Sequence, residues 1–528
     1  MTGLTDYLIE RKRVKAKQKN AGNHRSRQAA ESTYDNAKYN KPHSYMHSVD
    51  INIDVNVRTV FYIWVGSFIL VGAFAWYITG GVSMTSSNAY ERSNRAGGAY
   101  EYTSAFAQRH PGVIQYDRTV QYRKLREKYE AILPDSNTVS AKRRRAFVQD
   151  TARKRRYIPK NKQQQNYDYD YDDYDPFNCP PNPPKGYPRT YNALEVLQNW
   201  PPDDTAPPQN NEIYQGLCVF SFQHNSDGDG ENNNDTLQKI MTYQAAEVPY
   251  VVRDDPEVLK TVERWGQPDY LKELLRNDEH ITEYSVNNHF MYWQKPLRKD
   301  KKKLRGEGWS PPTKKIRMGY LDWLKHANAT VGGDFTKDGD VDVFGPDHSH
   351  WYFRLIGCGD YRSCTDKPSD FLFDELPFFR PRNKENIYLV NGKEQQGMHC
   401  RFGMKGVIAE NHFDASRNSI AILVGERRYI LAHPRECENL ALYPMDHPSR
   451  RHSAIDWSNP DLMKYPQFGN AQVNEIVLQA GDVLYLPTQW FHYIVSLELN
   501  FQCNIRSGRS EEYDYFIDKC GFGKTLHE

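Results

Sequence analysis

One uninterrupted hydrophobic run constrains this 528-residue chain more than any other feature. Residues 59–78 contain no charged side chain, and as a helix they would be about 30 Å long, which is the hydrocarbon thickness of a bilayer. Tyr62 and Trp64 near one end and Trp76 and Tyr77 near the other suit the two membrane interfaces. The run therefore predicts one transmembrane helix rather than a buried helix of a soluble core.

The basic residues around this run predict its orientation. Eight Lys and Arg residues lie between positions 11 and 27, whereas only Arg92 and Arg95 follow the run closely. Because Lys and Arg accumulate on the cytoplasmic side of membranes, the N-terminus is expected in the cytosol or the mitochondrial matrix. The large C-terminal part would then lie in the mitochondrial intermembrane space, which we favour, or in the lumen of the secretory pathway.

Charge and cysteine content exclude several classes of protein. Lys and Arg total 69 against 67 Asp and Glu, a balance that argues against a nucleic-acid partner. The eight cysteines include no C-x-x-C pair, so a zinc ribbon or a dense disulfide scaffold is not expected, and one or two disulfides remain possible.

Residues 79–246 show no repeat and are rich in Tyr, Pro and Asp, as in YDYDYDDYD at 167–175. They predict an extended linker with short helices that, together with the basic arm 1–58, binds other protein subunits.

The C-terminal half has the pattern of a mainly β domain. Short β-branched or aromatic runs such as SIAILVGERRYILAHP and EIVLQAGDVLYLP are divided by turn residues. Within them, His412 and Asp414 lie two residues apart on an expected strand and therefore point to the same face. His492 follows on a later strand. If these strands are neighbours, the three side chains form the two-histidine, one-carboxylate set that holds non-haem Fe(II).

A longer string of motifs carries a family resemblance. The segments GMKGVIAENHFDASRNSIAILVGERRYILAHP, AGDVLYLPTQWFHYIVSL and QCNIRSG, with VPYVVRDDPEVLKTVERW from Val248, resemble the cupin-like branch of the JmjC (Jumonji C) family over about residues 247 to 508. The resemblance implies a double-stranded β-helix, or jelly roll, with flanking helices. It also implies Fe(II) bound by His412, Asp414 and His492, and 2-oxoglutarate as the cosubstrate of a protein hydroxylase.

The resemblance further implies which residues meet 2-oxoglutarate. Asn418 and Asn504 match polar positions near the cosubstrate, and Arg427 stands where relatives have a Lys that pairs with its far carboxylate. Ala409 replaces a Thr that binds the cosubstrate in some members. Since two cosubstrate positions are altered, the sequence favours an accessory or scaffold subunit of a membrane complex that holds iron, another divalent metal or no metal. An active membrane-anchored Fe(II)/2-oxoglutarate dioxygenase is the alternative.

The predicted organisation has five parts. They are a basic arm (1–58), a transmembrane helix (59–78), an extended linker (79–246), the JmjC/cupin-like domain (247–508) and a C-terminal tail (509–528).

Overall fold

The structure is a computed structural model of the whole chain. It describes residues 118–132, 156–157, 175–208, 212–222, 233–267, 269–276, 278–296, 304, 308–332, 349–357, 371–380 and 387–522. The chain divides into two units, Met1–Ala105 and Phe106–Glu528, and every described residue lies in the second. The predicted arm 1–58 and transmembrane helix 59–78 lie outside the described residues. Among the helices that are described, none combines the length and the apolar character that crossing a membrane requires.

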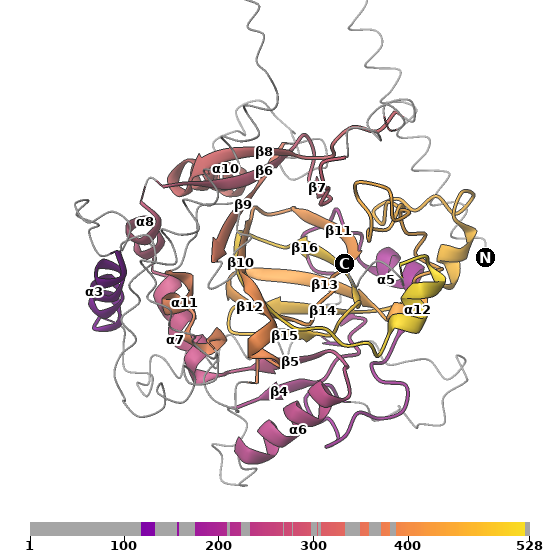
Figure 1. Ribbon diagram of the computed structural model, residues 1–528, viewed down its shortest axis with the longest axis horizontal. Helices are drawn as coiled ribbons and strands as arrows, with labels where there is room; N and C mark the ends of the chain where they lie inside the picture. Colours follow the sequence, from indigo (N-terminus) through magenta and orange to yellow (C-terminus); the bar gives the residue numbers. More distant parts are fainter. Residues whose placement is uncertain are drawn as a thin grey trace, which may run out of the picture. The chain divides into compact units, whose positions relative to one another are not determined.

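Two β-sheets face each other in the described part of the chain (Figure 1). The larger has nine strands, in the order β4 (Val219–Ser221), β5 (Tyr250–Arg253), β15 (Val483–Leu486), β12 (Asn418–Val424), β17 (Asn500–Ser507), β10 (Gln395–Gly403), β9 (His350–Gly357), β6 (Glu279–Ser285) and β8 (Lys314–Gly319). The smaller has six, in the order β2 (Tyr191–Asn192), β14 (Gln472–Gln479), β13 (Glu426–Ala432), β16 (Phe491–Ser496), β11 (Ile408–Phe413) and β7 (His289–Phe290). Strands β1 (Arg156–Tyr157) and β3 (Glu212–Ile213) form a separate parallel pair.

The space between the two sheets is apolar at one end. Ile420 of β12 and Tyr429 of β13 belong to one buried cluster, so the inner faces of the sheets pack on each other. The outer faces are buried as well, which explains why strands such as β12 are hydrophobic on both sides rather than alternating. The predicted mainly β jelly roll with flanking helices is confirmed.

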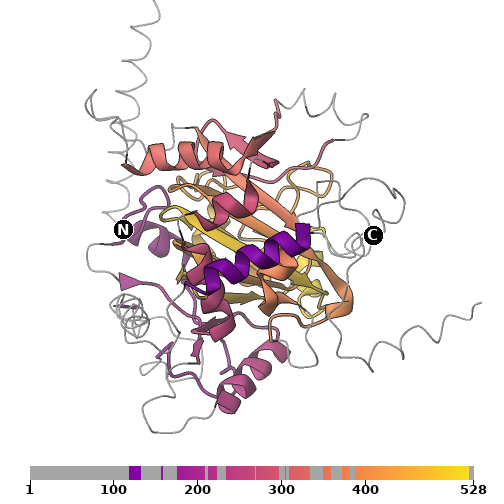
Figure 2. The same cartoon turned by 90° about the vertical axis from the view of Figure 1, so that its left-hand side faces the viewer.

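Helices cover the outer face of the nine-stranded sheet (Figures 1 and 2). The described helices are α3 (Arg118–Glu130), α5 (Ala193–Asn199), α6 (Asn233–Ala245), α7 (Pro256–Trp265), α8 (Tyr270–Leu275), α10 (Tyr320–Gly332), α11 (Leu372–Glu375) and α12 (Asp514–Lys519), with the short 3-10 turns η4 (Pro377–Phe379), η5 (Gly392–Glu394), η6 (Pro434–Glu436) and η7 (Pro466–Asn470). Helix α7 begins where the Asp255 side chain accepts a hydrogen bond from the Glu257 N–H, with Pro256 at its first position. It ends with Trp265, whose ring packs edge-on against Phe402 of β10 at 6.0 Å.

The folded unit begins well before residue 247. Strand β2 pairs with β14, β4 pairs with β5, and Tyr191 and Trp200 are buried against the outer face of the six-stranded sheet. The sequence predicts an extended linker up to residue 246, but in the structure residues 175–208, 212–222 and 233–246 pack against the sheets. Arg428 of β13 holds part of this segment on the sheet. It donates to the carbonyls of Trp200 (2.7 Å) and Val196 (3.3 Å), and so fixes the C-terminal end of α5.

Three disulfides join the described cysteines: Cys179–Cys218, Cys400–Cys503 and Cys437–Cys520. The expectation of one or two disulfides was therefore too low. The bridge between Cys400 and Cys503 links residues directly opposite each other on β10 and β17. Such a pairing depends on strand register, which residue spacing alone does not give.

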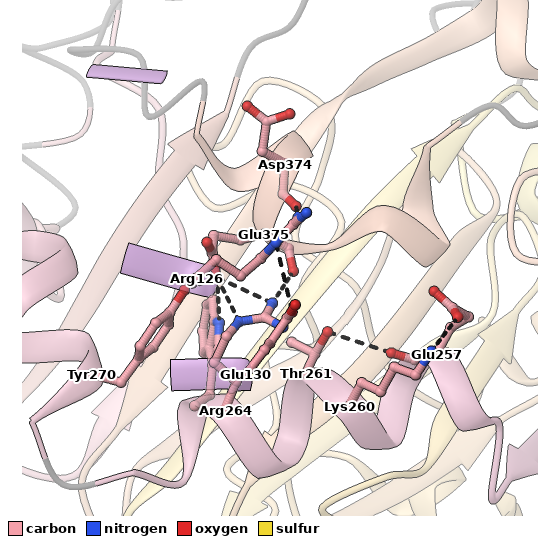
Figure 3. A network of polar contacts seen from close by, with 10 residues as sticks. Arg126, Glu130, Glu257, Lys260, Thr261, Arg264, Tyr270, Asp374 and Glu375 are labelled. Carbon is pink, nitrogen blue, oxygen red and sulfur yellow. Dashed lines mark hydrogen bonds and ion pairs between the residues drawn. The ribbon is translucent and has the colours of Figure 1, made fainter. Parts of the chain in front are cut away.

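Helix α3 packs against the outer helices through a network of charged side chains (Figure 3). Arg264 of α7 donates to Glu130 at the end of α3 (2.8 Å) and to Glu375 of α11 (3.2 Å). Trp265 and Tyr270 also donate to the same carboxylate oxygen of Glu375, at 3.2 and 2.7 Å. Arg264 and Glu375 are 2% and 1% exposed, so this pair lies inside the unit and only its link to α3 reaches solvent.

The Arg264 network yields a stability prediction. Arg264→Ala leaves the Glu375 carboxylate buried without its cation and should lower the free energy of unfolding by about 3 to 5 kcal/mol. Glu130→Ala removes only the link to α3 from a side chain that is 41% exposed, so it should cost about 1 kcal/mol or less. Urea unfolding followed by tryptophan fluorescence compares the two variants. Equal losses would contradict this assignment of the network.

Candidate functional site

Two of the predicted metal ligands are cross-strand neighbours. Strands β11 and β16 pair antiparallel, with His412 directly opposite His492. The centroids of the two imidazole rings lie 4.1 Å apart. A register shift between Ala409 and His412 interrupts the ladder just before this pair, and such bulges re-aim side chains next to functional sites.

The hydrogen bonds of the two rings fix their tautomers. Nδ1 of His412 lies 2.7 Å from the Glu410 carbonyl oxygen, and Nδ1 of His492 lies 3.0 Å from that of Trp490. A carbonyl oxygen can only accept, so each Nδ1 carries the proton. Burial lowers the pKa of both histidines, and the neighbouring His492 and His452 lower that of His412 further. Each neutral ring therefore keeps its Nε2 lone pair, the donor that metal-binding histidines use when Nδ1–H is held by a carbonyl.

Asp414, the third predicted ligand, is held as a carboxylate. Its Oδ1 accepts from Nη2 of Arg506 (2.6 Å) and its Oδ2 from Nδ2 of Asn418 (3.1 Å). Burial alone would raise the pKa of Asp414, but the positive charge of Arg506 holds it well below its usual range. Within the residues described, no group of three or more His, Cys, Asp or Glu side chains is arranged to hold a metal ion. The structure thus places two of the predicted ligands, His412 and His492, side by side, and the third, Asp414, forms an ion pair with Arg506.

The donor set nevertheless suits Fe(II) by its chemistry. Two neutral imidazoles and one ionised carboxylate are the ligands of non-haem iron sites. Each carboxylate oxygen of Asp414 accepts one hydrogen bond. A carboxylate has about four acceptor positions, so about two lone pairs remain for a metal ion.

A third histidine at the site has a structural role. His452 stacks on His412 with 4.9 Å between ring centroids. Its Nδ1 donates to the Ser449 carbonyl (3.1 Å), and its Nε2 accepts from the Tyr292 N–H (3.3 Å). Because both ring nitrogens are engaged by the backbone, His452 positions His412 and offers no lone pair to a metal.

The asparagines predicted to meet the cosubstrate form a chain that ends on Asp414. Asn504 of β17 donates to the side chain of Asn418 on β12 (2.8 Å), and Asn418 donates to Asp414. The two residues therefore connect the nine-stranded sheet to the carboxylate. Ala409 packs against the apolar cluster between the sheets and offers no polar side-chain group.

Arg427 lies on the inner face of β13, and its position depends on the preceding turn. Gly425 has a φ of +71°, and a Cβ there would meet the Leu499 carbonyl oxygen at 2.1 Å, so only glycine fits. The strand that follows sends Arg427 inward and Arg428 outward, as alternation requires. Both arginines are fully buried.

The Arg427 guanidinium is surrounded by uncharged acceptors. It donates to the side chain of Asn500, to Tyr352 Oη (2.9 Å) and Gln502 Oε1 (2.7 Å), and to the Arg401 carbonyl (3.3 Å). In the described part of the chain no carboxylate pairs with it. A buried cation that has hydrogen bonds but no carboxylate partner is costly, so an anionic ligand would stabilise it.

A second ion pair anchors the start of β11. His289 Nδ1 lies 2.5 Å from a carboxylate oxygen of Glu410. Burial alone lowers the pKa of His289, but the hydrogen bond and charge of Glu410 outweigh burial and raise it to about 9. A raised folded-state pKa contributes stability that is complete below the unfolded value of 6.5 and is lost as pH rises through 9.

This pair gives a prediction of pH dependence. The free energy of unfolding of the wild type should fall by about 1 to 3 kcal/mol between pH 6.5 and pH 9.5 relative to His289→Gln, which has no proton to lose in this range. Urea titrations of both proteins at the two pH values measure the difference. Parallel pH profiles would show that His289 is neutral in the folded chain.

Other polar side chains at this site were missed by the sequence analysis. Arg506, Arg401, Arg354 and Tyr352 all face the space between the sheets. The sequence signal for them is the alternation of polar and apolar residues in HCRFG (399–403) and NFQCNIRS (500–507). It shows which residues share a face of a strand, but not which sheet face is the interior.

Comparisons with known proteins agree with this architecture. Residues 236–506, about half of the chain, match the model of the cupin-like domain family. Lysine-specific demethylase 8 of Danio rerio is 34% identical over 165 residues, which are 29% of this chain and 40% of that protein. Human tRNA wybutosine-synthesizing protein 5 is 34% identical over 105 residues, 20% of this chain and 32% of that protein. JmjC domain-containing protein D of Dictyostelium discoideum is 31% identical over 111 residues, 21% of this chain and 25% of that protein.

The chain thus spans between a quarter and two fifths of the length of these curated relatives. The family match, by contrast, covers most strands of both sheets, from β5 to β17, and includes His412, Asp414, Arg427 and His492. The chain belongs to the cupin-like, JmjC-related domain family.

Proposed function

We propose that the chain is an Fe(II)- and 2-oxoglutarate-dependent oxygenase that hydroxylates a protein or peptide. The observation that carries the proposal is the pair His412 and His492, whose unprotonated Nε2 atoms lie on adjacent strands beside the ionised Asp414. These three residues would hold the iron, which when bound supplies the capacity to activate oxygen. Asn418 and Arg506 would keep the Asp414 carboxylate ionised and oriented.

The environment of Arg427 supports a role in cosubstrate binding. Its positive charge has no carboxylate partner among the described residues, and 2-oxoglutarate carries a free carboxylate at its far end. The guanidinium has five N–H donors, and the protein acceptors account for four of them. Tyr352 Oη accepts from Arg427, so its own hydroxyl proton can be donated to the same carboxylate.

The relatives and the charge of the chain bear on the substrate class. By their names, one relative acts on lysine and another on tRNA. This chain has a formal net charge of +2 over 528 residues, and nucleic-acid-binding proteins usually carry a marked basic excess. A protein or peptide is therefore the substrate that we propose.

An accessory role in a membrane complex is the second candidate. It is favoured by the same two groups: the donors of Arg427 are largely filled by the protein, and both oxygens of Asp414 are engaged. In that case residues 1–58 and 79–246 would bind other subunits, with α3 held on the outer helices as one docked part of the second segment.

The membrane anchor at residues 59–78 and the compartment are also proposals. Three disulfides suit an oxidising compartment. The intermembrane space and the secretory lumen both agree with the basic N-terminal arm on the opposite side. Protease protection tests this arrangement: in sealed vesicles with the N-terminal side of the membrane outward, the cupin-like domain should be protected and the arm should be cleaved.

Turnover of 2-oxoglutarate separates the two candidate functions. The purified full-length chain should release succinate from 2-oxoglutarate only with Fe(II) and oxygen, and metal chelation should stop the reaction. Asp414→Ala should lower the rate at least about a hundredfold, since loss of an iron ligand removes most bound metal. Lys325→Ala, which removes an exposed charge elsewhere, should leave the rate unchanged. A wild-type chain that binds iron but releases no succinate would favour the accessory role.

A further inference from the structure

Three arginines lie on the inner face of the nine-stranded sheet. Arg354 of β9 lies directly opposite Arg401 of β10, and Arg506 lies on β17, the next strand. Like charges directly opposite each other on a sheet destabilise it. We call Arg354, Arg401 and Arg506 the arginine cluster.

Carboxylates compensate only part of this charge. Arg354 pairs with Glu283 and Arg506 pairs with Asp414. Arg401 makes no ion pair in the described structure, and its one hydrogen bond runs to the carbonyl of its own neighbour, Cys400 (3.3 Å). Its guanidinium therefore uses one of its five N–H donors and has four left over.

Further donors around Arg401 also lack partners. Nε of Arg354 and Nε of Arg506 are buried N–H donors, and the described residues offer neither of them an acceptor. Nδ1 of His399 is also buried without a partner, and it is a donor only in the tautomer that carries the proton on Nδ1. Burial and the charges of Arg354 and Arg506 lower the pKa of Arg401 to about 9. The unsatisfied guanidinium donors, around a cation repelled by its neighbours, would be stabilised by an anion with several oxygen atoms.

The arginine cluster is distinct from the predicted cosubstrate anchor. Arg427 lies at the Gly403 end of β10, where a Cβ on Gly403 would meet Ser496 Oγ at 2.7 Å and Arg427 Nη2 at 3.0 Å. The side chains of Arg401 and His399 follow at the next two inward positions of the same strand. One edge of the cluster reaches solvent, because the Arg506 side chain is 33% exposed.

We propose that the arginine cluster is an oxyanion subsite centred on Arg401, which binds a carboxylate or phosphate group in addition to the carboxylate that Arg427 would hold. The planar guanidinium fork of Arg matches the paired oxygens of both groups. If the chain hydroxylates a peptide, this subsite selects a substrate with an acidic or phosphorylated side chain. The binding itself needs neither iron nor turnover.

The test uses metal-free, full-length protein, so that it does not depend on the proposed oxygenase activity. Inorganic phosphate and succinate are added separately at constant ionic strength set with chloride, and the thermal unfolding midpoint is recorded. The wild-type midpoint should rise with at least one anion, and Arg401→Gln should weaken the apparent affinity at least tenfold. Arg401→Lys keeps the charge and should retain part of the response, while Lys325→Gln should respond like the wild type.

The midpoints without either anion provide a second readout. Arg401→Gln removes an unpaired repulsive charge, so in phosphate-free buffer its midpoint should equal or exceed that of the wild type, whereas a merely structural arginine would leave a less stable variant. A response to phosphate alone would identify a phosphate site, and a response to both anions a general oxyanion site. No response to either anion in the wild type, or an unchanged response in Arg401→Gln, would overturn the proposal.

Discussion

Replacing Arg427 by Met should reduce the affinity for 2-oxoglutarate by a factor of several hundred. The reason is that the side chain supplies the buried cation that the far carboxylate would meet, and loss of one partner of a buried charged pair costs about 3 to 5 kcal/mol. Arg427→Lys is the matched control, because it keeps the charge and restores the residue type that the JmjC resemblance implies at this position. It should retain measurable binding.

A folding defect must be separated from a binding defect in this experiment. Arg427→Met leaves the acceptors on Asn500 and Gln502 without their donor, so some loss of stability is expected. Circular dichroism at the temperature of the titration shows whether the variant is folded. If folded Arg427→Met binds 2-oxoglutarate like the wild type, Arg427 is not the anchor.

The adjacent substitution, Arg428→Met, should act on stability instead. Arg428 points to the other face of β13, where it forms a fully buried ion pair with Glu475 (2.6 Å) and lies over the Trp200 ring at 4.5 Å. Its removal leaves the Glu475 carboxylate uncompensated and frees the carbonyls at the end of α5. The free energy of unfolding should fall by about 3 to 5 kcal/mol.

A double substitution is the control for this second prediction. Arg428→Met combined with Glu475→Met removes both charges, so it should recover much of the lost stability, since a well-packed apolar pair can replace a buried ion pair. Urea unfolding measures all three proteins. At a temperature low enough for the Arg428→Met protein to be folded, it should bind 2-oxoglutarate like the wild type. Loss of binding without loss of stability would contradict the opposite orientation of the two arginines.

The sequence was sufficient to predict the central features of the domain. The short β-branched and aromatic runs divided by turn residues predict a mainly β fold, and the two-residue spacing of His412 and Asp414 predicts a shared face. The pairing of His412 with His492 required β11 and β16 to be neighbours, which the structure confirms. Whether His412, Asp414 and His492 bind iron stays a prediction, since no described group is arranged as a metal site.

Features that depend on long-range register could not be predicted. The contact of Arg506 with Asp414 spans 92 residues, and that of Arg428 with Trp200 spans 228. In the sequence, the segments before residue 247 resemble a linker because their elements are short: β2 has two residues and α5 has seven. Elements of this length show no periodicity, and they are buried only because the sheet provides a surface for them.

The most direct test of the account is a calorimetric titration of 2-oxoglutarate into anaerobic, Fe(II)-loaded full-length protein, with Arg427→Met and His492→Ala in parallel. The two departures at Ala409 and Arg427 favour the accessory role, which predicts weak or absent binding of 2-oxoglutarate. The unpaired charge of Arg427 and the tautomers of His412 and His492 lead us to expect a dissociation constant of about 1 to 100 μM for the wild type. Binding should be lost in both variants. An iron-loaded wild type that shows no binding heat at several temperatures would contradict the account and favour the accessory role.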